Sequence, residues 1–233
     1  MKAVIVIPTF NEGERLISTL TDLDKALAET ANWEFEIVLV DDASARPFSL
    51  RDLNFRLPIY LLRHNTNLGQ GAALETAFTY CRRTLAPDYV VTIDADGQHS
   101  SQDIIKFLNH LITSDLDILF GNRFTKDLEM PRLRFFVLMF ARVFEKFITG
   151  LNLSDAHNGF RVFNRKALEA LVLNQNRMAH ATEVKQIVAR SGLRCGELHS
   201  RISYSSETLA KGQSNIGALI ILRDLLKSYL FDR

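Results

Sequence analysis

The chain is organised around a segment that reads Tyr89-Val90-Val91-Thr92-Ile93-Asp94-Ala95-Asp96-Gly97-Gln98-His99. Its first half is rich in β-branched residues and has no helical period, which predicts a buried strand. Asp94 and Asp96 follow at the carboxyl end of that strand, where open α/β sheets place their ligands. Because side chains alternate along a strand, the two carboxylates are expected on the same side, with the small Ala95 between them.

These two carboxylates predict a cation site. Like charges this close repel each other, so a bound cation stabilises the pair. With the amide of Gln98 they form an oxygen-only ligand set, which suits a hard ion such as Mg²⁺ or Mn²⁺. For an isolated Asp-x-Asp the alternative is a loop of solvated acids, and the surrounding chain has to distinguish the two.

Strand-like and helix-like segments alternate around this segment. Apolar runs predict strands at 3–7, 35–40, 59–62 and 116–120, besides the one that leads into Asp94. Helical spacing predicts helices at 14–29, from the turn at 65–73 to about 84, and at 101–113. The alternation predicts an α/β fold with a mostly parallel sheet and helices on both faces. At 233 residues the chain is expected to form one domain.

Polar side chains follow three of the predicted strands. Glu12 comes shortly after the first strand, Asp41 and Asp42 end the second, and Asp94 and Asp96 end the fourth. The carboxyl ends of parallel strands meet at one edge of a sheet, so these carboxylates are expected to converge there. Such convergence favours a ligand site over solvated acids.

The composition excludes several classes of function. Lys and Arg number 28 and Asp and Glu 27, a net charge of +1, so no nucleic-acid partner is expected. Cys81 and Cys195 lack metal-ligand spacing and are expected to be reduced and buried, as in a cytosolic protein. The short apolar run at the N-terminus ends at Pro8, unlike a signal peptide, and no apolar run reaches the ~18–20 residues of a spanning helix.

Two later segments are amphipathic and aromatic. Residues 133–151 hold five phenylalanines within thirteen residues and are flanked by Arg132, Arg134 and Arg142. Residues 216–231 repeat the pattern, with leucines opposite charged side chains. Each could be a helix that packs on the core, but together they also predict helices that lie in a membrane interface.

Seven short motifs occur in order along the chain: Ile7–Glu12, Val40–Ser44, Asn67–Ala73, Asp94–His99, Gly121–Phe124, Asp155 with Asn158–Arg161, and Lys211–Ser214. With these motifs the chain resembles the family 2 glycosyltransferases of GT-A fold, and among them the dolichyl- and polyprenyl-phosphate sugar synthases. The resemblance extends from about residue 4 to residue 214. The chain departs from the family pattern at Phe10, where Tyr is usual, at Gln70, where Lys is usual, and at Lys211, where Arg is usual.

The resemblance implies a site for a UDP- or GDP-linked sugar in residues 1–125 and an acceptor half in residues 126–233. Glu12 and Asp41 would lie near the nucleoside, Gly69 and Gly71 would let the backbone approach the donor, and Asp94, Asp96 and Gln98 would hold Mg²⁺ or Mn²⁺ at the diphosphate. Structural alternatives are that Asp41 caps the next segment, that Gly71 only packs, and that Gln98 neighbours a helix N-cap. The positions that match the donor site are Pro8, Thr9, Glu12, Asp41, Asp42, Gly69, Gly71, Ala72, Asp94, Ala95 and Lys211.

The acceptor side carries cations and lacks an evident general base. A hydroxyl acceptor needs such a base. In relatives of that kind an Asp acts as the base, and this chain has Val184 at the corresponding position, in Thr182-Glu183-Val184. A phosphate monoester is already largely ionised near neutral pH, and Arg123, Arg134 and Lys211 could hold it. Arg134, three residues after Pro131, resembles the family's acceptor-phosphate arginine, and Arg132 is the alternative.

The sequence therefore predicts metal-dependent, inverting transfer of a sugar to a polyprenyl phosphate, with Asp96, Arg123 and Arg134 as catalytic residues. It predicts a protein held on the cytoplasmic face of a membrane, with a membrane protein as a possible partner. The alternatives are a family 2 enzyme with a hydroxyl acceptor and Glu183 or another, unidentified acid as base, and a non-catalytic subunit that binds nucleotide sugars.

Overall fold

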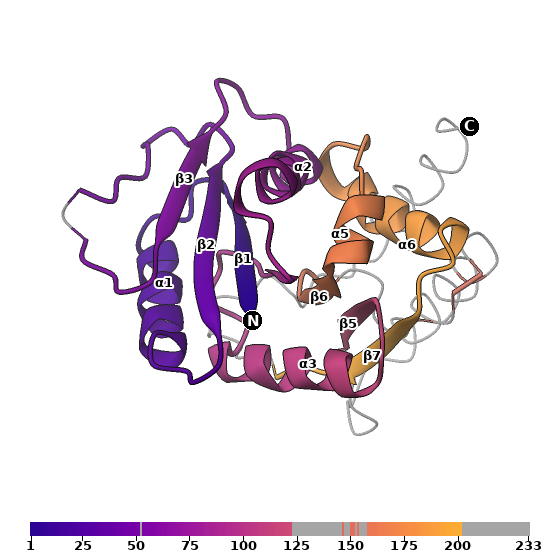
Figure 1. Ribbon diagram of the computed structural model, residues 1–233. Helices are drawn as coiled ribbons and strands as arrows, with labels where there is room; N and C mark the ends of the chain where they lie inside the picture. The colour runs from indigo at the N-terminus through magenta and orange to yellow at the C-terminus, as the bar shows by residue number, and fades with distance from the viewer. Residues whose placement is uncertain (52, 123–145, 147–149, 152, 154–157, 202–233) are drawn as a thin grey trace, which may run out of the picture.

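The computed structural model describes residues 1–51, 53–122, 146, 150, 151, 153 and 158–201 (Figure 1). Its strands are β1 (Lys2–Thr9), β2 (Glu34–Asp41), β3 (Ile59–Arg63), β4 (Tyr89–Thr92), β5 (Ile118–Asn122), β6 (Arg161–Asn164) and β7 (Cys195–His199). Its helices are α1 (Glu14–Leu27), α2 (Gln70–Tyr80), α3 (Ser101–Thr113), α5 (Arg165–Ala170) and α6 (His180–Arg190). A π-helical turn, η1 (Cys81–Leu85), extends α2, and a 3-10 turn, η2 (Arg177–Ala179), precedes α6.

The described strands form one sheet in the order β3-β2-β1-β4-β6-β5-β7. Neighbouring strands are parallel except at β6, which is antiparallel to both β4 and β5. The predicted α/β fold with a mostly parallel sheet is therefore confirmed. Because β6 and β7 belong to the second half of the chain, both halves contribute to the same sheet.

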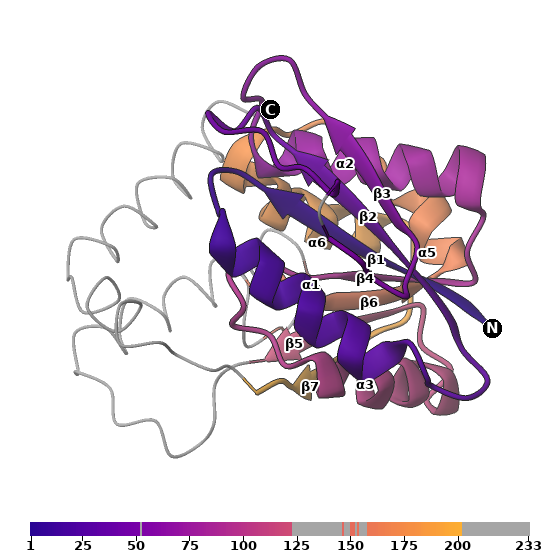
Figure 2. The same cartoon turned by 90° about the vertical axis from the view of Figure 1, so that its left-hand side faces the viewer.

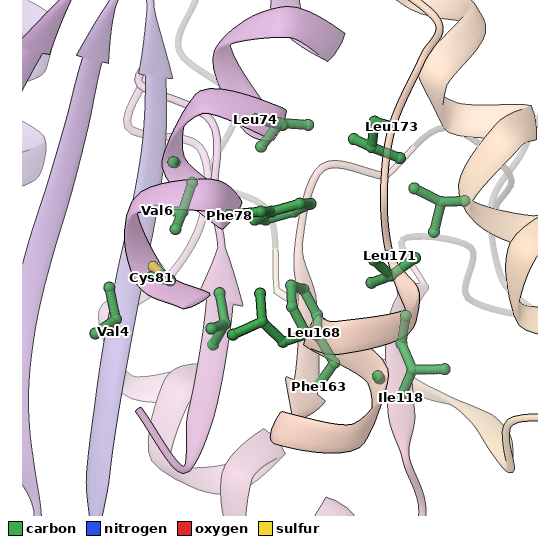
Figure 3. Close-up of a cluster of buried hydrophobic side chains, with 14 of the residues drawn as sticks. Val4, Val6, Leu74, Phe78, Cys81, Ile118, Phe163, Leu168, Leu171 and Leu173 are labelled. Atoms are coloured by element: carbon green, nitrogen blue, oxygen red, sulfur yellow. The ribbon is translucent and has the colours of Figure 1, made fainter. Parts of the chain in front are cut away.

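Helices cover both faces of this sheet, as Figure 2 shows. Alternate residues of β1 point to opposite faces: Ile5 and Ile7 pack in the core under α1 and α3, and Val4 and Val6 pack in the core under α2, α5 and α6. Phe78 of α2 lies at the centre of the second core, between Val6 and the leucines of the 168–173 segment (Figure 3). Burial on both faces explains why β1 is apolar at every position from Ala3 to Ile7.

Several element boundaries differ from the sequence prediction. The fifth strand begins at Ile118 rather than 116, because the Asp117 side chain is buried among polar partners before the strand starts. Helix α1 ends at Leu27, and α2 gives way at Cys81 to the π turn, which ends at the left-handed Ala86. Strands β6 and β7 and helices α5 and α6 have no counterpart among the predicted elements. The short β6 contains the charged Arg161, so it lacks an apolar run that would reveal it.

Both cysteines are free, but only one is fully buried. Cys81 lies in the core under α2, and burial raises the pKa of its thiol to about 12. Cys195 lies on the edge strand β7 and is half-buried, so the expected burial of both was wrong for this residue. The amphipathic segments at 133–151 and 216–231 lie largely or wholly outside the described residues. Among the helices that the structure describes, none is long and apolar enough to cross a membrane.

Candidate active site

The loops after β1, β2 and β4 meet at the carboxyl edge of the sheet. The register pairs Thr9 with Asp41, and the backbone N–H of Asp42 donates to the carbonyl oxygen of Thr9 over 2.9 Å. The N–H of Asn11 donates to Ser44 Oγ over 2.8 Å, and Asn11 Oδ1 accepts from the N–H of Ala45 over 2.9 Å. The loop that carries Glu12 is therefore tied to the loop that follows Asp41.

Asp41 is only 1% exposed, yet one of its carboxylate oxygens has no hydrogen-bond donor in the described part of the chain. Oδ1 accepts from the N–H of Ser44 over 2.9 Å, as the capping alternative predicted. Oδ2 has no hydrogen bond, and the guanidinium Nε of Arg63 lies 3.8 Å from it. An unpaired buried carboxylate oxygen is costly, so this atom is suited to accept from a ligand N–H or O–H group.

Both carboxylate oxygens of Asp42 have hydrogen-bond partners, in contrast to those of Asp41. Its Oδ1 accepts from the N–H of Leu68 over 2.9 Å and lies 2.7 Å from His64 Nδ1. Its Oδ2 accepts from the N–H of Gly69 over 2.7 Å. Asp42 was predicted to line the donor pocket, and the structure places its carboxylate under the turn that opens α2. Its contacts shape that turn.

Asp94 lies two residues beyond the end of β4, about a third of its side chain exposed, between two further side chains. Oδ1 accepts from Gln70 Nε2 over 2.9 Å, and Oδ2 lies 3.3 Å from His99 Nε2. Burial opposes ionisation of Asp94. The hydrogen bond and charge of His99, the charge of Arg161 and the Gln70 bond outweigh that effect and hold the pKa of the Asp94 carboxyl below its ordinary value.

Gly159, in the loop before the neighbouring strand β6, leaves room for the Asp94 carboxylate. A Cβ atom at Gly159 would lie 2.3 Å from Asp94 Oδ2, so no side chain fits there. Thr92 Oγ1 donates to the Gly159 carbonyl oxygen over 2.7 Å and holds the glycine beside β4. The Gly-Phe-Arg motif, which the sequence analysis used only as a family mark, thus packs against a predicted metal ligand.

Asp96 and Gln98 form the turn beyond Asp94. Asp96 Oδ1 accepts from the N–H of Gln98 over 3.0 Å, and Gly97 between them adopts a φ of 74°. Within the described residues no group of three or more His, Cys, Asp or Glu side chains converges as a complete metal site. Two carboxylates nevertheless fit Mg²⁺ or Mn²⁺, because such ions are held in proteins by one or two carboxylates together with substrate phosphates.

At Gly69 and Gly71, the space that a side chain would need is already filled by the segment before α6. A Cβ on Gly69 would lie 2.6 Å from the N atom of Arg177, and one on Gly71 would lie 2.1 Å from the carbonyl oxygen of Gln175. Gly69 also has a φ of +98°, which disfavours any other residue. The packing alternative for Gly71 thus agrees with its contacts, and the segment before α6 lies over the start of α2.

Glu183, the alternative general base, is engaged in holding that segment. Its Oε1 accepts from the N–H of Asn174 over 2.9 Å and its Oε2 from the N–H of Gln175 over 2.8 Å. Both oxygens therefore already accept backbone hydrogen bonds. A general base has to lie within hydrogen-bond reach of the hydroxyl that it deprotonates, and both oxygens of Glu183 are instead turned toward the backbone of the loop before α6.

The remaining predicted positions fall into two groups. Pro8 and Thr9 end β1, Ala72 lies in the first turn of α2, and Ala95 is buried between the two carboxylates. Arg123, Arg134 and Lys211 lie outside the described residues. His99 and Arg63 were not predicted as site residues, and Gln70 was noted only as a departure from the family pattern; Gln70 and His99 stand within quoted motifs.

Comparison with known proteins identifies the family of this chain. Residues 4–172 match the family described as Glycosyl transferase family 2. A dolichyl-phosphate hexose transferase of Haloferax volcanii is 33% identical over 74% of this chain and 70% of its own length. A UDP-N-acetylglucosamine–dolichyl-phosphate N-acetylglucosaminyltransferase of Methanococcus voltae is 25% identical over 95% of this chain and 94% of its own length.

A solved structure shares the fold. Glucosyl-3-phosphoglycerate synthase from Mycobacterium tuberculosis, in complex with Mn²⁺ and UDP-glucose, superposes with a TM-score of 0.62 at 13% identity, over 94% of this chain and 78% of that chain. This likeness confirms the GT-A fold. The family match covers well over half of the sequence. The chain therefore belongs to glycosyl transferase family 2 and is a glycosyltransferase.

Proposed function

We propose that the protein transfers a sugar from a nucleoside-diphosphate sugar to a polyprenyl phosphate, with inversion at the anomeric carbon and with Mg²⁺ or Mn²⁺ as cofactor. The observation that carries the choice of acceptor is the engagement of Glu183, whose two carboxylate oxygens accept backbone hydrogen bonds. A phosphate acceptor needs no general base, because it is already largely ionised near pH 7. The names of the two relatives agree with a lipid-phosphate acceptor.

The donor half of the proposal rests on the carboxylates at the sheet edge. The free Oδ2 of Asp41 would accept from the nucleoside, on the base or the ribose. Asp94, Asp96 and Gln98 would hold the divalent cation. That cation would neutralise the negative charge that develops on the departing nucleoside diphosphate.

The reaction would then be a single displacement. An oxygen of the acceptor phosphate forms a bond to the anomeric carbon, while the bond from that carbon to the diphosphate breaks and its electron pair leaves with the nucleoside diphosphate. No proton has to move for these bonds to change. Arg123, Arg134 and Lys211 would position the incoming phosphate, and the amphipathic segments at 133–151 and 216–231 would hold the enzyme at the cytoplasmic membrane surface, with or without a membrane partner.

The direct test is product formation. The purified protein is incubated with Mg²⁺, a polyprenyl phosphate and UDP- or GDP-sugars that carry a radiolabel on the sugar. The label is expected to enter the organic phase as a sugar-phospholipid that mild acid releases. A parallel reaction with the unphosphorylated polyprenol should give no product. Transfer to the alcohol, or to a glycan hydroxyl with a basic group in its pH profile, would replace this proposal by the hydroxyl-acceptor alternative.

A further inference from the structure

The first residue of α2 reaches across to the end of β4. Gln70 follows the turn at Gly69, and its side-chain Nε2 donates to Asp94 Oδ1 over 2.9 Å. This is the position at which the family motif usually has Lys. The chain therefore places an uncharged donor on its predicted metal ligand, where a lysine would place a positive charge.

The turn before Gln70 is held in place by hydrogen bonds to Asp42. The buried carboxylate of Asp42 accepts from the N–H groups of Leu68 and Gly69. His64 joins Asp42 to the middle of α2, with its Nε2 2.9 Å from Thr76 Oγ1. The amide of Gln70 thus starts from a backbone that has little freedom to shift. The fold therefore places the Gln70 side chain within hydrogen-bond distance of Asp94.

Asp94 is also confined on its other oxygen. His99 Nε2 lies 3.3 Å from Oδ2, and the backbone of Gly159 closes the remaining side. A carboxylate that is held at both oxygens cannot rotate freely. Each oxygen can still accept a second interaction, because a carboxylate oxygen has two lone pairs. Partners of this kind, outside the ligands themselves, orient metal-binding side chains in many sites.

We propose that Gln70 is a positioning residue for the divalent cation: it orients Asp94 through a neutral amide and so adds no positive charge of its own beside the metal. This inference rests on the metal assignment within the proposed function. A lysine ammonium at the same place would also orient Asp94, but it would repel the incoming cation. At separations of a few ångströms such repulsion is substantial even when solvent screens it.

The test is a Mn²⁺ titration followed by electron paramagnetic resonance of the free ion, with and without a nucleoside diphosphate. The variants are Gln70→Met, which keeps the length of the side chain without its donor, and Gln70→Lys. Gln186→Lys adds the same charge on α6, where the described contacts do not reach Asp94, and is the matched control. Thermal melts identify any variant that fails to fold.

Gln70→Met is expected to weaken Mn²⁺ binding by about tenfold, as loss of an outer-shell partner does elsewhere. Gln70→Lys is expected to weaken it further, and the gap between the two should narrow at high salt because Asp94 is partly exposed. Gln186→Lys should bind as the wild type does. Folded Gln70 variants with wild-type or tighter Mn²⁺ affinity would overturn the inference.

The proposed function is judged separately in the same titration. Asp96→Ala should lose most Mn²⁺ binding. If it binds as tightly as the wild type, the metal assignment fails and this inference fails with it. If the metal results hold but no sugar-phospholipid forms in the product assay, only the acceptor part of the proposed function fails.

Discussion

Two buried aspartates at opposite edges of the sheet show how a carboxylate that stabilises the fold differs from one that is available for a ligand. Asp117 lies at the amino end of β5, 1% exposed, and accepts from the N–H of Arg194, from Asn164 Nδ2 and from Lys166 Nζ. Asp41 lies at the carboxyl end of β2, equally buried, and its Oδ2 has no hydrogen bond within the described chain. The two side chains have the same chemistry and the same burial.

The difference lies in the hydrogen-bond donors that the surrounding residues supply. At Asp117, burial opposes ionisation, but the hydrogen bonds from Arg194, Lys166 and Asn164 hold the pKa of the carboxyl well below its usual range. At Asp41 the fold leaves an acceptor unused, which costs stability unless a ligand completes it. A buried carboxylate oxygen without a hydrogen-bond donor, such as Asp41 Oδ2, is therefore a candidate ligand contact when other buried carboxylates of the same fold have their donors.

The largest effect is expected at Asp96, on the functional edge. Asp96→Ala should lower turnover by about 1,000-fold, because the leaving diphosphate loses its metal ligand. The measurement is initial rate with saturating donor, and removal of the metal with EDTA should lower the wild-type rate to a similar degree. Glu169→Ala, an exposed charge on α5, is the control. An Asp96→Ala protein that is folded and active would remove the metal site from this edge.

A large loss of stability is expected at the opposite edge. Asp117→Ala should lower the free energy of unfolding by roughly 3 kcal/mol, since it removes the acceptor of the Arg194 N–H, of Asn164 Nδ2 and of Lys166 Nζ. Urea unfolding gives the value, and activity per folded molecule should not change. Because the folded-state pKa lies below the ordinary one, the stability that Asp117 adds is present above about pH 4 and is lost as the pH falls further. The variant should accordingly lose less stability in acid than the wild type.

Asp41 should behave in the opposite way. Asp41→Asn replaces a carboxylate oxygen with an amide donor and should weaken nucleotide binding by about tenfold, the loss of one charged hydrogen bond. Thermal stability should stay nearly equal, because Oδ2 makes no hydrogen bond and its ion pair with Arg63 is long and partly exposed. Isothermal calorimetry with the nucleoside diphosphate and a thermal melt give the two values. A destabilised variant with unchanged nucleotide affinity would place Asp41 with Asp117, among residues that only support the fold.

The smallest effect is expected at Glu183. Glu183→Gln keeps one acceptor oxygen for the loop before α6 and should cost about 1 kcal/mol of stability. Its turnover should remain within a few-fold of the wild type, with an unchanged pH profile. A loss of turnover beyond 100-fold, without a loss of nucleotide binding, would instead identify Glu183 as a general base and the acceptor as a hydroxyl.

Much of the donor half could be predicted from the sequence. The apolar strand of residues 3–7, the helix at 101–113 and the acids after β2 and β4 were confirmed in place. These features are local: a strand buried on both faces must be apolar throughout, and a chain that alternates strand and helix brings its strand ends to one edge. The later strands could not be predicted in the same way, because the short β6 and the edge strand β7 are defined by pairing with distant partners.

The sequence by itself determined the fold class and the set of carboxylates that follow the strands at one edge of the sheet. Only the tertiary structure decided the contacts of the individual side chains. Asp42 accepts hydrogen bonds from the turn before α2, and Asp41 Oδ2 accepts none. Gln70 donates to Asp94, and Glu183 accepts from the loop before α6. The physical reason is that local pattern sets which side chains face the core or the edge. A hydrogen bond between residues far apart in the chain depends on packing that no local pattern records.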